Sequence, residues 1–219
     1  MASTKNILQP LIRSNIALLS QKIGLLDVLV SKNNNKLTVA TKQFAKICPY
    51  VNASIGQHYR HSLDHIELAA LVAQQQQSLA IDCDNSNNVV PELHYDLRVR
   101  GGTLESDLQL CRERIVNIVN VFESLQQSTT TNTNDDNDDD TTQLTNQPIK
   151  AYFNLSSTSN EELPLPTTIG RELGFVVHHS IHHMAMCKVI ALHTLKFTED
   201  ELPEGFGKAP STLLFDKNK

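Results

Sequence analysis

Hydrophobic residues recur every three or four positions along four long stretches of the chain, which is the spacing of one helix face. The stretches cover residues 5–31, 54–78, 103–127 and 168–196. In the third stretch the apolar positions alternate steps of four and three without a break: Leu104, Leu108, Cys111, Ile115, Ile118, Phe122 and Leu125. Such a seam predicts long amphipathic helices that pack together as a bundle.

Several shorter features accompany these helices. Residues 39–46 favour a short helix, and residues 149–156 alternate apolar and polar positions as a short strand does. Ser54, followed three positions later by Gln57, fits a capping box at the start of the second helix. The turn-rich segment 198–219 contains apolar residues near its end, so we expect this tail to pack on the bundle.

An acidic segment, residues 129–147, interrupts the helical pattern before the last helix. It holds too few apolar residues to offset the entropy of ordering, so we expect a disordered, flexible loop. It also lacks the spaced ligands and the glycine of an EF-hand calcium loop. The sequence therefore predicts one all-α domain over residues 1–219, a four-helix bundle whose long connections leave the order of the helices open.

Composition and charge exclude several classes of function. With 40% hydrophobic and 20% charged residues the chain is globular, and its net charge of −5 argues against sequence-independent nucleic-acid binding. No apolar run approaches the roughly 20 residues that span a bilayer, and the N-terminus lacks the apolar core of a secretory signal. We therefore expect a cytoplasmic protein that binds neither nucleic acid nor membrane.

Histidines are concentrated on two of the predicted helices. On the second helix, His58, His61 and His65 step by three and four along the stripe that later becomes plainly apolar. On the fourth, four of the 9 histidines fall within residues 178–183. Their spacing divides them into two pairs at i and i+4, on neighbouring helix faces about 100° apart. Only one pair can be centred on the interior.

Two interpretations of the inward histidines remain open. They are either neutral imidazoles hydrogen-bonded to their neighbours or ligands of a metal. Burying several unsatisfied imidazoles costs about 1–3 kcal/mol each, and a divalent cation removes that cost by accepting a lone pair from each ring. An i, i+4 pair joined by an imidazole from a facing helix gives three ligands, which leaves a position open for water or substrate.

Four separated segments resemble the DinB/YfiT-like superfamily of metal-binding four-helix bundles, in particular a subgroup of uncharacterised DinB-like proteins. They are SIGQHYRH at 54–61, YDLRVRG at 95–101, GRELGFVVHHSIHH at 170–183 and FGKAPSTL at 206–213. The resemblance implies an up-down-down-up bundle that holds a divalent metal, either zinc or nickel, with iron or manganese as alternatives. Carried over by position, the three metal ligands are His61, His179 and His183.

The resemblance also implies an activity. Characterised relatives use the open metal position to activate a low-molecular-weight thiol or water, so we expect a metal-dependent transferase or hydrolase with a small-molecule substrate. A homodimer is a further expectation from the resemblance. The alternative is a non-catalytic, metal-stabilised bundle with a binding or sensing role. A fourth ligand, such as His65 or Glu172, together with a sealed core would favour that alternative.

Other residues are candidates for supporting roles. Glu172, one heptad before His179, is a candidate base or a partner of the metal ligands, and equally a first-turn acid favoured by the helix dipole. Four residues before the third predicted helix are candidates for lining the pocket and holding an anionic group: Tyr95, Asp96, Arg98 and Arg100. The alternative is that they belong to a solvated surface loop. The remaining inward or neighbouring histidines would then surround the site: His58, His65, His178 and His182.

Overall fold

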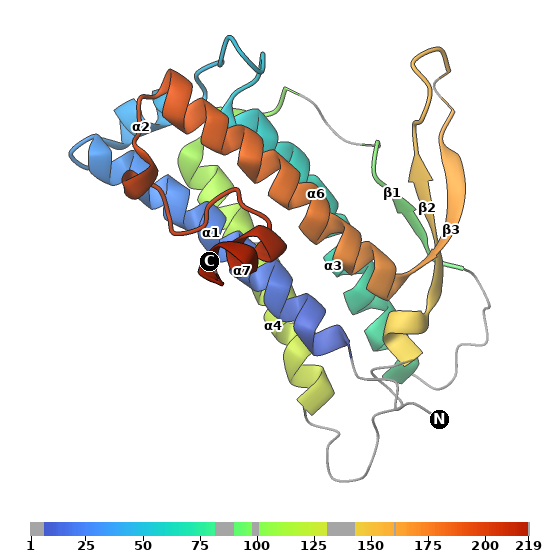
Figure 1. Cartoon of the computed structure of the whole chain (residues 1–219). Helices are drawn as coiled ribbons and strands as arrows, with labels where there is room; N and C mark the ends of the chain where they lie inside the picture. Colours follow the sequence, from blue (N-terminus) through green and yellow to red (C-terminus); the bar gives the residue numbers. More distant parts are fainter. Residues whose placement is uncertain (1–6, 82–89, 98–100, 131–142, 160, 219) are drawn as a thin grey trace. The chain divides into compact units, whose positions relative to one another are not determined.

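The computed structural model describes residues 7–81, 90–97, 101–130, 143–159 and 161–218. This part of the chain is mostly helical (Figure 1). Its four long helices are α1 (Leu8–Lys32), α3 (Ile55–Ile81), α4 (Leu108–Thr130) and α6 (Ile169–Val189). Each coincides with one of the four stretches of apolar periodicity, so these helices are confirmed.

Shorter helices flank the long ones. The predicted helix at 39–46 is observed as α2 (Leu37–Phe44). A 3-10 turn, η1 (Thr103–Glu105), precedes α4, and a π-helix, η2 (Ile190–Thr194), continues α6. The tail contains a second 3-10 turn, η3 (Glu199–Glu201), and α7 (Pro210–Lys217).

A small three-stranded sheet accompanies the mostly helical fold that the sequence predicted. Its strands are β1 (Glu92–His94), β2 (Pro148–Phe153) and β3 (Leu163–Thr168), in the order β1-β2-β3. The pairing is parallel between β1 and β2 and antiparallel between β2 and β3 (Figure 1). Only β2 was predicted. Two prolines, at positions 164 and 166, obscure β3, and they are tolerated there because β3 is an edge strand.

The described chain groups into two compact units. The sheet unit comprises residues 1–16, 64–98 and 118–176, and the histidine unit comprises residues 17–63, 99–117 and 177–219. Each unit has buried apolar side chains of its own. In the sheet unit they include Ile12, Ile66, Phe122, Ile149 and Leu173, and in the histidine unit Leu19, Leu26, Phe44, Leu63 and Ile190.

The acidic segment 129–147 is only partly described. Residues 131–142, which carry the predicted loop, lie outside the described residues. The expected disorder does not extend to residues 143–146, which form a helical turn with a buried Thr145. Gly170 lies directly against this turn, since a Cβ added there would be 2.9 Å from the Thr145 carbonyl oxygen.

The C-terminal tail packs within the histidine unit. Phe206 is buried, and Gly207 has a φ of +71° at a point where an added Cβ would lie 2.9 Å from the Met184 carbonyl oxygen. Pro203 lies against Gly24 of α1. The tail therefore contacts both α1 and α6 within this unit.

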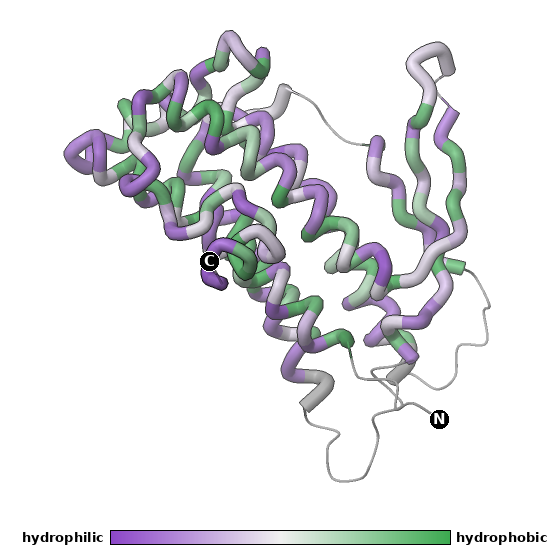
Figure 2. Tube along the Cα trace, viewed as in Figure 1, coloured by the Kyte–Doolittle hydropathy of each residue, from purple (hydrophilic) through white to green (hydrophobic). Residues whose placement is uncertain are grey.

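Hydrophilic and hydrophobic residues are interspersed along the helices, as expected for amphipathic helices (Figure 2). None of the described helices combines the length and the sustained apolar character needed to cross a bilayer.

Candidate metal centre

The start of α3 is fixed by local hydrogen bonds that the sequence predicted. The Ser54 N–H donates to Gln57 Oε1 at 3.0 Å, and the Gln57 N–H donates to Ser54 Oγ at 3.1 Å. This reciprocal capping box satisfies two free backbone donors. It sets the register of the first turns of the helix, from which His58 and His61 project.

Four half-buried histidines of the histidine unit form two facing pairs. His61 and His179 approach through their Nε2 atoms, which are 3.0 Å apart. His58 and His183 approach through their Nδ1 atoms, which are 2.9 Å apart. Each pair joins a residue of α3 to a residue of α6, because steps of three and four place both members on one face of each helix.

The three predicted ligands therefore lie together. The ring centroid of His183 is 4.5 Å from that of His61 and 4.6 Å from that of His179, and the last two centroids are 5.0 Å apart. The three rings are thus close neighbours within the histidine unit.

The second histidine pair of α6 points elsewhere. His178 and His182 are both exposed, whereas His179 and His183 are half-buried. His182 keeps an edge contact with His183, with ring centroids 5.3 Å apart. The helical spacing divided the four residues into two pairs, and the pair on the interior is His179 and His183.

Two of the inward imidazoles, His58 and His183, are held neutral. Burial lowers the pKa of His58 to about 4, with smaller contributions from the charges of Lys22 and His182. Burial lowers the pKa of His183 to about 2, and the neighbouring His61 and His179 add to the effect. At neutral pH each of these two rings therefore has one nitrogen with a free lone pair, which is the form that binds metals.

The donor set fits a divalent cation. Two imidazole nitrogens 3.0 Å apart repel unless a proton or a cation lies between or beside their lone pairs. Nitrogens bonded to one zinc ion at about 2.0–2.1 Å lie roughly 3.3 Å apart in tetrahedral geometry. Neutral imidazoles suit zinc, nickel and iron. His58 Nε2 is buried and has no hydrogen-bond partner among the described residues, which marks the cluster as incompletely satisfied by protein alone.

Sequence reasoning missed Lys22, a fully buried amine in the same unit. Its Nζ donates to Ser62 Oγ at 2.7 Å and lies 4.5 Å from the centroid of the Tyr59 ring. Burial lowers the pKa of Lys22 to about 8. The detectable signal was its place on the apolar face of α1, three or four residues from Leu19 and Leu26.

Glu172, the candidate base, lies in the sheet unit and is 1% exposed. Its Oε1 accepts hydrogen bonds from Thr167 Oγ1 at 2.7 Å and from Arg171 Nη1 at 2.6 Å. Its Oε2 accepts one from the Tyr95 hydroxyl at 2.8 Å. Because three donors bond its two oxygens, this carboxylate links the start of α6 to Thr167 and Tyr95 within the unit.

The structure describes two of the four expected pocket residues, Tyr95 and Asp96. Tyr95 is fully buried and stacks on His65, with ring centroids 4.5 Å apart, so it belongs to the core of the sheet unit. Asp96 accepts a hydrogen bond from the Asn154 N–H through Oδ2 at 2.9 Å, which ties two loops together. Arg98 and Arg100 lie outside the described residues.

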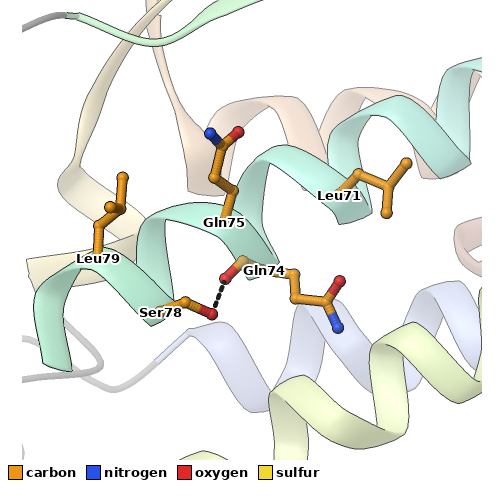
Figure 3. A pocket seen from close by; sticks show the side chains of 5 residues that line it. All are labelled: Leu71, Gln74, Gln75, Ser78 and Leu79. Carbon is orange, nitrogen blue, oxygen red and sulfur yellow. Dashed lines mark hydrogen bonds between the residues drawn. The ribbon is translucent and has the colours of Figure 1, made fainter. Parts of the chain in front are cut away.

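A separate hollow of about 500 Å³ lies on α3 (Figure 3). All five lining side chains project from this one helix: Leu71, Gln74, Gln75, Ser78 and Leu79. Ser78 Oγ donates to the Gln74 carbonyl oxygen at 3.0 Å. The lining offers amides, a hydroxyl and apolar groups but no titratable side chain, so it supplies neither an acid, a base nor a strong metal ligand.

No protein-family model and no solved structure matches the chain. Among curated proteins, the chain is similar to FK506-binding protein 5 from Rhizopus delemar, with 29% identity over 128 residues. The match covers 58% of this chain and 28% of the Rhizopus protein, so the chain spans much less than two thirds of that relative. A match of this identity and coverage does not establish a shared family.

Proposed function

We propose that this chain is a divalent-metal-binding protein of the DinB-like kind, and a metal-dependent transferase or hydrolase. Its substrate would be a small molecule, with a low-molecular-weight thiol or water as the activated group. The proposal extends to the up-down-down-up order of the four long helices that the sequence resemblance implies.

One observation carries the proposal. The half-buried rings of His61, His179 and His183 face one another with centroids 4.5–5.0 Å apart. Three imidazoles are the ligand number of catalytic zinc sites, whereas structural sites have four protein ligands. None of the three rings is fully buried, which supports access by a small molecule.

The roles of the chain's own groups follow from this arrangement. His61, His179 and His183 would hold the metal through neutral ring nitrogens. When bound, the metal would lower the pKa of a coordinated water or thiol toward neutrality. The neighbouring Lys22 places a positive charge in the same unit, which favours an anionic form of the activated group.

The alternative function is a non-catalytic, metal-stabilised helical protein with a binding or sensing role. In that case the metal would contribute to folding, and a fourth protein ligand would close the site. Cobalt substitution separates the two functions. Addition of a small thiol changes the visible spectrum of the cobalt protein if a coordination position is open, and leaves it unchanged if the site is closed.

The decisive experiment is elemental analysis of the purified full-length chain and of single variants. We expect about one zinc or nickel ion per wild-type chain and loss of the metal in His61→Ala and His183→Ala. His178→Ala is the matched control on α6, because His178 is exposed and should not alter metal content.

Equal metal content in wild type, His61→Ala and His183→Ala would remove the proposed site. Loss of the metal in His65→Ala as well would instead favour the alternative function, in which His65 is a fourth protein ligand.

A further inference from the structure

His58 is a member of the histidine cluster to which neither spacing nor resemblance gives a ligand role. It lies three residues before His61 on α3, and its Nδ1 is 2.9 Å from Nδ1 of His183. Its backbone is held in place because Ser62 Oγ donates to the His58 carbonyl oxygen at 2.8 Å. The ring contact with His183 is therefore built on a fixed helical turn.

The contact restricts how His183 can bind a cation. Two lone pairs at 2.9 Å would repel, so when no cation lies between the two Nδ1 atoms, one proton does. Since Nδ1 of His183 is occupied by this contact, only its Nε2 is left for a metal. A metal on Nε2 requires the proton to sit on Nδ1 of His183, and Nδ1 of His58 must then accept it.

In this arrangement the ring proton of the neutral His58 lies on Nε2. His58 Nε2 is buried and has no hydrogen-bond partner among the residues that the structure describes. The one polar contact of the His58 ring is thus the contact with His183. Leaving a buried imidazole nitrogen without a hydrogen-bond partner costs free energy, so packing alone does not explain a histidine at this position. A role in orienting the neighbouring His183 through the second ring nitrogen does explain it.

We propose that His58 is a positioning residue, which accepts a hydrogen bond from His183 Nδ1–H and thereby holds the Nε2 of His183 ready for the metal. The inference rests on the proposed function and deepens it, because it names a residue that sets the metal affinity of the same site. Partners of this kind typically contribute 10–100-fold to metal affinity.

The test compares His58→Phe with His58→Asn. Phenylalanine keeps a planar ring but removes the acceptor, whereas the Asn side-chain oxygen can occupy the position of Nδ1 and accept the same hydrogen bond. We expect nickel affinity, measured by competitive titration, to fall about 10–100-fold in His58→Phe and to stay within a few-fold of wild type in His58→Asn. Metal stoichiometry at saturation should remain unchanged in both variants.

A second readout does not depend on metal. Long-range nitrogen–proton correlation NMR of the metal-free wild-type protein reports which ring nitrogen carries the proton. We expect the proton of His183 on Nδ1 in wild type and in His58→Asn. In His58→Phe this preference should be lost.

Three results would overturn the inference. The first is wild-type nickel affinity in His58→Phe. The second is loss of bound metal in both variants, which would make His58 a ligand itself. The third is a proton on Nε2 of His183 in the metal-free wild-type protein. Absence of nickel binding by wild type would instead refute the proposed function. The NMR measurement would still show whether His183 donates its Nδ1 proton to His58.

Discussion

At the scale of single residues, Lys22 is the least expected feature of the histidine unit. Its amine is fully buried, with one hydroxyl acceptor at 2.7 Å and an aromatic ring beside it. A buried amine without a carboxylate partner is costly when charged.

The pKa of Lys22 gives a stability prediction. Its folded-state pKa of about 8 lies below the ordinary value of 10.5, so folding disfavours the charged form. The penalty, about 3 kcal/mol, is fully present below pH 8 and disappears as the pH rises through 10.5. We therefore expect Lys22→Met to raise the free energy of unfolding at pH 7 by up to about 3 kcal/mol.

Urea denaturation at pH 7 and at pH 10.5 measures this effect. The advantage of Lys22→Met over wild type should shrink as the pH rises, because only wild type gains stability on losing the proton. A constant difference between the two proteins across this range would contradict the assigned pKa.

Residue-scale prediction from sequence succeeded where local periodicity decides the outcome. Steps of three and four placed His61, His179 and His183 on inward helix faces. Spacing along a helix could not identify the surroundings of Glu172, because Thr167 and the Tyr95 hydroxyl reach it from strand and loop segments. Long-range partners of this kind leave no periodic signal in the sequence.

At the scale of elements, the long helices were predictable and the sheet was not. The apolar seams extend over several turns, which makes the helical period unambiguous. β1 has three residues, and it pairs with β2 across more than fifty positions of sequence. A strand that short shows no recognisable alternation, so its existence depends on a partner that local patterns do not reveal.

The N-terminal end of α3 offers an element-scale prediction. A Cβ added at Gly56 would lie 2.0 Å from the Glu105 carbonyl oxygen. Because the contacted atom belongs to the backbone, the backbone would have to move to relieve this clash. We expect Gly56→Ala to destabilise the protein by a few kcal/mol, about the range of overpacking substitutions. It should also lower metal content, because this turn positions His58 and His61.

Gly102→Ala is the matched control, since an added Cβ there meets nothing within 4 Å. Thermal unfolding followed by circular dichroism measures both variants. Similar midpoints for Gly56→Ala and wild type would show that the start of α3 can shift without loss of stability.

At the scale of the whole molecule, the sequence established that the protein is mostly helical but not how its parts group. The compact units draw on distant segments, such as residues 17–63 with 177–219. Grouping of this kind depends on tertiary contacts between segments, whereas periodicity reports only which face of each helix is buried.

Metal binding should couple the candidate centre to the stability of the whole chain. A ligand that binds only the folded state stabilises it by about 2.7 kcal/mol at a concentration of 100 times Kd. For a chain of this size that corresponds to roughly 5–11 °C in Tm. We therefore expect added nickel to raise the Tm of metal-stripped wild type by about this amount, and a chelator to reverse the rise.

The size of the shift also separates the two functions. An enzyme with a preformed site should remain folded without metal and gain only this increment, and His183→Ala should show no shift at all. A metal-stabilised structural protein should lose most of its helical circular dichroism on metal removal, because binding free energy then supplies the free energy of folding. An equal rise in wild type and His183→Ala would mean that nickel binds outside the histidine cluster.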